Sequence, residues 1–308
     1  MTSTTSAQGT TTHRTELLSQ LAHEVLALRG SEAWQRYLEV QARFHRYSPR
    51  NVMLIALQRP EATSVAGFRT WASLGRQVRK GERAMSILAP MVRRSDGESD
   101  LLVVGFRWVS VFDVSQTDGE PLPTPVSLLE GTGPRALRAS LERAAASFGF
   151  DVVLAELPAG VNGECRWARA TIALSRATSP LQQAKTLAHE LGHALLHRHE
   201  PDRARAEIEA ESVAFVVLAA HGADATAYSA GYLASWLGDA GDPTLAIRRS
   251  LDAIQRASSE ILCAMEEPTD SGSESSPPPS LHLVTKEAVA LQTLSAEDEG
   301  QRRELSEP

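Results

Sequence analysis

Apolar residues recur at helical spacing at the start of the chain. In residues 15–29 the leucines and valines stand three or four positions apart, which predicts an amphipathic helix. A second helix is predicted from Ser31, a good N-cap residue, to about Tyr47. A break at residues 48–51 follows, and then a short apolar segment at 52–58.

Strand-like runs follow these helices. Residues 84–92 are largely apolar and residues 101–114 are rich in β-branched and aromatic residues, and the polar loop between them is typical of a hairpin. Residues 67–82, punctuated by glycines, predict turns and short helical pieces. The first half of the chain is therefore predicted to be α+β.

The second half begins after a segment rich in proline and glycine at residues 117–125. An amphipathic helix is predicted at 134–148, strands at 152–156 and 169–174, and three or four helices from there to about residue 266. The predicted fold class is α+β in two domains.

Composition gives the boundaries of these domains. We predict an N-terminal domain at 14–118, a linker at 119–129 and a C-terminal domain at 130–265. A disordered leader at 1–13 and a disordered acidic tail at 266–308 flank them, because both segments are polar and poor in aromatic residues.

The net charge of −7 over 308 residues is unevenly distributed. Residues 266–308 hold 10 Asp/Glu and 3 Lys/Arg, which accounts for the whole excess. Residues 34–94 hold 12 Lys/Arg against 3 Asp/Glu, whereas residues 119–265 hold 13 against 17. An acidic total therefore does not exclude a nucleic acid partner for the N-terminal domain.

The location predicted for the chain is cytoplasmic, without a membrane partner. No stretch approaches the roughly 18 to 20 apolar residues of a membrane span, and the first residues do not resemble a secretory signal. Cys165 and Cys263, far apart and outside any metal or redox motif, fit a reducing compartment.

The strongest chemical signal is His189-Glu190-Leu191-Gly192-His193. On a helix, residues i and i+4 share one face, so His189 and His193 can hold one zinc ion. Zinc lowers the pKa of a bound water to about 7, and Glu190 beside it can accept the proton as general base. This spacing predicts a Zn²⁺-dependent hydrolase.

A catalytic zinc ion needs a third protein ligand, and a glutamate-rich helix follows at residues 206–220. Glu207 and Glu211 share a face, so one can bind the metal and the other can orient a ligand histidine; we favour Glu207 as the ligand and Glu211 as the support. Glu209 points elsewhere, and its simplest interpretation is a solvated acidic face.

Other polar residues near the motif have weaker interpretations. His197 lies one turn beyond the two histidines, so a structural or surface role is favoured over metal binding. His221, Tyr228 and Tyr232 are alternatives for stabilising the oxyanion of a tetrahedral intermediate, and the sequence does not choose among them.

Cations and aromatic residues alternate in the basic segment. Cations neutralise phosphates and aromatic faces stack on unpaired bases, so this pattern predicts single-stranded-DNA binding, although any single aromatic is better explained as a core residue. The residues assigned to this interface are Arg43, Arg46, Tyr47, Arg50, Arg69, Trp71, Arg76, Arg79, Lys80 and Arg83.

Two family resemblances agree with these patterns. HELGHALLH at 189–197, followed by the glutamate helix from Glu207 to Glu211, resembles the ImmA/IrrE zincin metallopeptidases, in which the first glutamate of that helix would be the third ligand. Residues 34–60 and 67–90 resemble the single-stranded-DNA-binding domain of ArdC-type antirestriction proteins of bacteria. The VVLAAHG segment at 216–222, after the glutamate motif, departs from many ImmA/IrrE members.

These observations leave three hypotheses. The first is a zinc endopeptidase that acts on a protein substrate, for example a DNA-bound protein, and is coupled to single-stranded-DNA binding. The second is a non-proteolytic, single-stranded-DNA-binding antirestriction protein with a structural or regulatory zincin domain. In the third, the basic segment is a surface that docks another protein.

Overall fold

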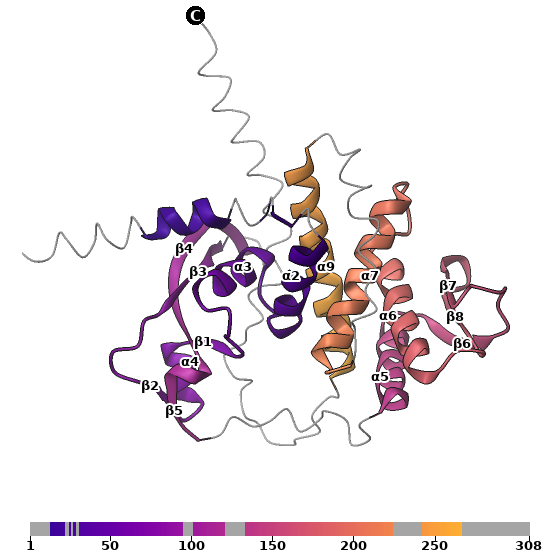
Figure 1. The fold of residues 1–308 in the computed structure, drawn as a ribbon, viewed down its shortest axis with the longest axis horizontal. Coiled ribbons are helices and arrows are strands. Elements are labelled where there is room, and N and C mark those ends of the chain that lie inside the picture. The colour runs from indigo at the N-terminus through magenta and orange to yellow at the C-terminus, as the bar shows by residue number, and fades with distance from the viewer. Residues whose placement is uncertain are drawn as a thin grey trace, which may run out of the picture. The chain divides into compact units, whose positions relative to one another are not determined.

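The structure is a computed structural model that describes residues 13–21, 25, 27–28, 31–94, 101–120, 133–223 and 242–266. Most of the predicted leader and linker, the predicted tail beyond Glu266, Tyr228 and Tyr232 lie outside the described residues. The described chain divides into two compact units, one made of residues up to 64 together with residues from 120 onward, the other of residues 65–119. Each unit is described by itself (Figure 1).

The first unit includes two N-terminal helices, α2 (Ser31–Arg43) and α3 (Pro49–Gln58). The predicted break lies between them, where the Ser48 hydroxyl caps α3 and Pro49 occupies its first turn. The apolar segment at 52–58 is therefore helical, and its residues Val52 to Ile55 are buried.

The grouping of α2 and α3 differs from the predicted domain boundary at residue 118. Both helices pack with C-terminal helices, because Trp34 is buried and donates a hydrogen bond from Nε1 to Ser212 Oγ at 3.0 Å. Gln255 likewise donates to the carbonyl of His45 at 3.0 Å. Helical periodicity indicated that α2 has a buried face, but it did not indicate which part of the chain covers that face.

In the C-terminal part of this unit, the described residues form a small sheet and four α-helices. The elements are α5 (Pro134–Ser147), β6 (Asp151–Ala155), β7 (Gly163–Arg166), β8 (Thr171–Ser175), α6 (Pro180–Leu196), α7 (Arg203–Ala220) and α9 (Pro243–Met265). The strand order is β6-β8-β7, with β6 parallel and β7 antiparallel to β8. β7 therefore forms one edge of the sheet, and α6 packs beside it (Figure 1).

α7 is the central helix of the first unit. It packs against α2, α6 and α9, and it is buried on nearly every side from Ile208 to Leu218. α6 approaches it closely at Gly192, where an added Cβ would lie 3.1 Å from Cα of Ala210. A glycine inside a helix costs about 1 kcal/mol relative to alanine, and here it permits the two helices to come together.

The second unit consists of short elements and one long hairpin. Its elements are β1 (Val65–Gly67), α4 (Phe68–Ser73), β2 (Arg76–Val78), β3 (Met85–Arg94), β4 (Leu101–Asp113) and β5 (Thr117–Gly119). β1, β4 and β3 form one antiparallel sheet, and β2 pairs with β5 in another.

The predicted hairpin and the α+β fold class are confirmed. β7 was not predicted, because four residues containing one glycine leave no strand pattern. Among the helices that the structure describes, none has the length and apolar character needed to cross a membrane.

Candidate metal centre and basic surface

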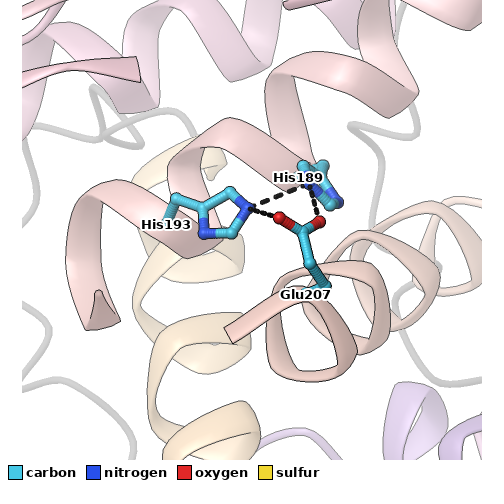
Figure 2. Close-up of side chains that lie close together, drawn as sticks. All are labelled: His189, His193 and Glu207. Carbon is cyan, nitrogen blue, oxygen red and sulfur yellow. Dashed lines mark hydrogen bonds and ion pairs between the residues drawn. The ribbon is translucent and has the colours of Figure 1, made fainter. Parts of the chain in front are cut away.

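Three side chains from α6 and α7 converge on one point (Figure 2). Nε2 of His189 and Nε2 of His193 lie 3.1 Å apart, and the Glu207 carboxylate lies 3.5 Å from the first and 3.7 Å from the second. Ligand atoms about 2.0–2.2 Å from one tetrahedral ion stand about 3.3–3.6 Å from one another. The three predicted ligands therefore fit a divalent cation such as zinc.

Local sequence brings Glu207 to the two histidines. α6 ends at Leu196 and the Asp202 side chain caps the start of α7 at Arg203, so the polar turn between the helices is short. The close approach at Gly192 then places the first turns of α7 beside His189 and His193.

Glu190 lies on α6 against strand β7 and is 8% exposed. Burial raises the pKa of its carboxyl group, while the neighbouring histidines and the Cys165 backbone N–H, which donates a hydrogen bond to it, oppose that rise. Gly163 of β7 leaves room for the Glu190 side chain because it has no Cβ. A Cβ at this position would lie 2.3 Å from Cγ2 of Thr186 and 3.2 Å from Oε1 of Glu190. β7 thus positions the predicted base, although the sequence did not reveal that strand.

Glu211 lies beside the other ring nitrogen of His189. Its Oε2 is 3.4 Å from Nδ1 of His189, which is within ion-pair distance but does not meet hydrogen-bond geometry, and its Oε1 is 2.8 Å from Nζ of Lys185. Glu207 therefore faces the nitrogens that converge, whereas Glu211 faces the back of one ring. This is the arrangement expected when a carboxylate orients a metal-binding imidazole.

The electrostatics of the cluster favour bound positive charge. Burial lowers the pKa of His189, but Glu207 and Glu211 outweigh it and raise that pKa to about 9. Hydrogen bonding to His189 and then to His193 holds the pKa of Glu207 well below its usual range. Glu207 is therefore ionised at neutral pH, as a metal ligand must be.

Glu209 and His197 do not lie on the surface. Their side chains are 2% and 3% exposed, and His197 Nε2 lies 3.0 Å from Glu209 Oε2. The interpretation of Glu209 as a solvated acidic face is therefore wrong, since helix spacing alone does not tell which outward face another helix covers. His197 is buried, which excludes the surface alternative, and it lies outside the converging trio.

His221 does not offer a free ring to the metal centre. Its Nδ1 lies 2.9 Å from the carbonyl oxygen of Val217, one turn back on α7. Of the three oxyanion alternatives, the other two, Tyr228 and Tyr232, lie outside the described residues.

The residues predicted to bind DNA divide between the two units. In the first unit, Arg43 donates to the Ala62 carbonyl at 3.1 Å and Arg46 forms an ion pair with Glu266. Tyr47 packs edge-on against Phe44, and burial raises its pKa to about 12. Arg50 is half-buried and acts electrostatically on Asp252.

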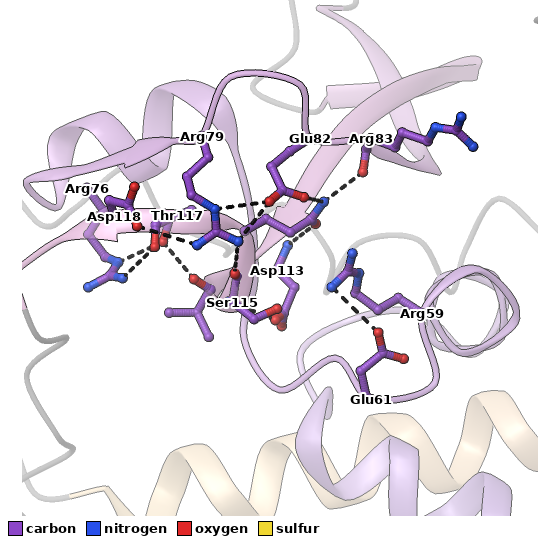
Figure 3. A network of polar contacts seen from close by, with 12 residues as sticks. Arg59, Glu61, Arg76, Arg79, Glu82, Arg83, Asp113, Ser115, Thr117 and Asp118 are labelled. Atoms are coloured by element: carbon purple, nitrogen blue, oxygen red, sulfur yellow. Dashed lines mark hydrogen bonds and ion pairs between the residues drawn. The ribbon is translucent and has the colours of Figure 1, made fainter.

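In the second unit, Arg76 and Arg79 connect β2 to the segment around β5 (Figure 3). Arg76 donates to Thr117 Oγ1 at 2.8 Å and to the Thr117 carbonyl at 3.1 Å. Arg79 contacts Glu82 at 2.7 Å, Asp118 at 3.4 Å and the Ser115 carbonyl at 2.6 Å. Both guanidinium groups therefore stabilise this unit, which limits their availability to phosphates.

The structure does not support Trp71 as a base-stacking residue. Its side chain is 2% exposed, and Nε1 donates to the Phe112 carbonyl at 2.9 Å, so the ring belongs to the core of the second unit. Phe68, three residues earlier on α4, is 58% exposed and is the aromatic side chain of this helix that a base can reach.

Four cations of the second unit are exposed, and no contact with another described side chain engages them. They are Arg69, Lys80, Arg83 and Arg107, of which Arg107 was not predicted as a site residue. Arg69 directly follows Phe68. A cation beside an exposed ring is a suitable arrangement for a phosphate and its base.

Comparison with protein families places two known domains on this chain. The model of the N-terminal domain of anti-restriction factor ArdC matches residues 15–118. A peptidase model, the IrrE N-terminal-like domain, matches residues 145–226 and so includes every residue of the metal centre.

Comparison with individual proteins found remote relatives. An uncharacterized protein of Bacillus anthracis, pXO2-81, is 26% identical over 63% of this chain, and the chain spans only 41% of its length. Crystal structures of the antirestriction protein ArdC from plasmid R388 are 22% identical in the metal-free form and 21% in the Mn(II)-bound form. The match to the metal-free structure covers 71% of this chain and 85% of that chain, with a TM-score of 0.44. The match to the Mn(II)-bound structure covers 74% of this chain and 97% of that chain, with a TM-score of 0.42.

Proposed function

We propose that this chain, which carries an ArdC-type N-terminal domain followed by an IrrE N-terminal-like domain, is a zinc-dependent endopeptidase coupled to single-stranded-DNA binding. The observation that carries the proposal is the convergence of His189, His193 and Glu207 at ligand distances, with Glu190 buried beside them. Its substrate is a protein, and its proposed location is the cytoplasm.

The chemistry follows from the positions of the side chains. When bound, zinc supplies a Lewis acid that acidifies water and polarises the carbonyl of a peptide bond. Glu190 accepts a proton from the attacking water and transfers it to the leaving amine. Burial and the Cys165 N–H hold the Glu190 carboxylate in one place, so little reorganisation is needed during proton transfer.

Strand β7 is suited to hold the peptide. No described strand pairs with its outer edge, and the Cys165 N–H on that edge reaches Glu190. An extended peptide that pairs with this edge would therefore lie beside the base, bound by backbone groups with little dependence on its sequence.

The basic surface of the second unit is the proposed DNA interface. Phe68 offers an exposed face, and Arg69, Lys80, Arg83 and Arg107 offer cations that other described side chains do not engage. Stacking on an exposed aromatic ring does not require a particular base. The proposed interface therefore binds single strands with little sequence preference.

The test compares wild type with Glu190→Gln, using full-length protein, casein as substrate, and assays with and without an oligothymidylate. We expect both proteins to contain stoichiometric zinc by elemental analysis, and the variant to lose casein cleavage by at least about 100-fold. Glu156→Gln, the same change at an exposed position after β6, is the control and keeps full activity. Full activity of Glu190→Gln would contradict the assigned base.

A second candidate function is a non-proteolytic antirestriction protein that binds single strands. The exposed Phe68, followed directly by Arg69, favours it, because DNA binding at these residues does not require the metal centre. In this case Glu190→Gln leaves protection from restriction intact, whereas Phe68→Ala with Arg69→Gln abolishes it. The two functions also differ in the effect of DNA, since only the first links oligothymidylate to casein cleavage.

A further inference from the structure

We propose that His197 and Glu209 are positioning residues for the metal ligand His193, to which they are joined in one hydrogen-bonded chain. The inference rests on the proposed metal centre and extends it to residues outside the converging trio. The chain runs from Nδ1 of His193, the ring nitrogen that does not face the metal, through a second imidazole, to a buried carboxylate on α7.

The contacts are continuous. Nδ1 of His193 lies 3.0 Å from Nδ1 of His197, and Nε2 of His197 lies 3.0 Å from Oε2 of Glu209. The two rings meet edge to face, with centroids 5.0 Å apart at an interplanar angle of 66°. One nitrogen of each ring therefore points along the chain toward the carboxylate.

Donor and acceptor chemistry allows only one arrangement that also binds a metal. His193 must present an unprotonated Nε2 to the cation, so its proton resides on Nδ1 and is donated to His197. His197 accepts at Nδ1, so its own proton resides on Nε2 and is donated to Glu209, which as a carboxylate can only accept. The chain thus fixes both tautomers.

The carboxylate at the end of the chain is itself held in place. Glu209 Oε1 accepts hydrogen bonds from Nε of Arg205, at 2.7 Å, and from the hydroxyl of Ser250 on α9. Burying an unpaired carboxylate would cost several kcal/mol, and Arg205 offsets this cost. The hydrogen-bonded chain and the partners of Glu209 therefore come from α6, α7 and α9 and the residues next to them.

The two ligand histidines are supported differently. Behind His189 stands Glu211, whose side chain is 21% exposed and is shared with Lys185. Behind His193 stands a chain that is almost completely buried, so water does not compete for it. We infer that His193 is the ligand whose orientation is set before the metal arrives.

The first test measures zinc affinity by competition with a chelator for wild type, His197→Phe and His197→Gln. Phenylalanine keeps an aromatic ring but can neither accept a hydrogen bond from His193 nor donate one to Glu209, so zinc should bind about 10- to 100-fold more weakly. Glutamine restores one acceptor and one donor and should recover most of the affinity. His199→Phe, at an exposed neighbouring position, is the matched control and should bind as wild type does.

The free energy of unfolding of the metal-free proteins is measured as well, because it distinguishes a positioning role of His197 from a general structural role. A folded His197→Phe protein with wild-type zinc affinity would overturn the inference. Wild-type protein that binds no zinc would instead refute the proposed metal centre.

The second test needs no variant, so it remains informative if His197→Phe does not fold. Long-range ¹⁵N–¹H NMR spectra of the full chain should show His193 protonated at Nδ1 and His197 protonated at Nε2. A His193 ring that lacks the Nδ1 proton in the zinc-bound protein would overturn the chain.

Discussion

The metal centre on α6 and α7 and the basic surface of residues 65–119 are both polar, but they are built in different ways. At the metal centre the side chains converge from two neighbouring helices, and residues spaced i, i+4 on one helix share a face; the two histidines are partly buried and Glu207 is exposed. On the basic surface the cations are exposed, and no periodicity determines which of them pair. Spacing thus predicts which residues of a helix can converge, whereas composition predicts only that a surface is basic.

The charge count of residues 34–94 illustrates this difference. Twelve cations against three acids suggested one interface, yet the structure divides them between two units. Arg46 pairs with Glu266, far away in the sequence, and Arg79 pairs with Glu82 and Asp118. A local charge excess does not reveal such partners, because folding brings acids from other segments.

The largest expected effect tests whether Glu207 and Glu211 have the different roles in the metal centre that we assign to them. Glu207→Gln should weaken zinc binding by more than about 100-fold, because a direct ligand is lost. Glu211→Gln should weaken it by only about 10- to 100-fold, as expected for a group that orients a ligand. Calorimetric titration with zinc checks both, and the reverse order would exchange the two roles.

The next prediction separates the two aromatic residues of α4. Trp71→Ala should lower the free energy of unfolding by about 3–5 kcal/mol, since a buried ring is removed and the Phe112 carbonyl loses its donor. Phe68→Ala should lower it by less than about 1 kcal/mol, because that ring is exposed. Urea denaturation measures both, and equal losses would show that Phe68 is also a core residue.

Phe68→Ala should instead weaken binding of an oligothymidylate. Loss of one stacking interaction costs about 1–3 kcal/mol, which corresponds to about 5- to 150-fold in affinity. Leu74→Ala, another exposed apolar residue of the same unit, is the control. Fluorescence anisotropy at fixed salt provides the measurement, and unchanged affinity would remove Phe68 from the interface.

The smallest effect concerns individual cations. Lys80→Gln with Arg83→Gln should reduce the slope of log affinity for single-stranded DNA against log salt by about 1.4, as expected for two lost phosphate contacts. Arg36→Gln with Arg135→Gln removes the same charge from exposed positions of the first unit. If both pairs change the slope equally, the basic surface acts only through net charge.

Sequence reasoning was most informative where one element carried the whole signal. The i, i+4 spacing of His189 and His193 on one helix, and of Glu207 and Glu211 on the next, led to the assignments that the geometry supports. The sequence did not predict that β7 positions Glu190, because this strand has only four residues. The burial of Glu209 and Trp71 depends on elements far away in the sequence, which local patterns do not contain.

Gly192 affects the metal centre as well as the packing of α6 against α7. Its hydrogen atom sets how far α7, and with it Glu207, stands from the two histidines on α6. A methyl group there would push the helices apart by a few tenths of an ångström, which is comparable to the differences in ligand distance between divalent metals. The residue between the histidines therefore influences the spacing of the three candidate ligands, although it offers no ligand atom itself.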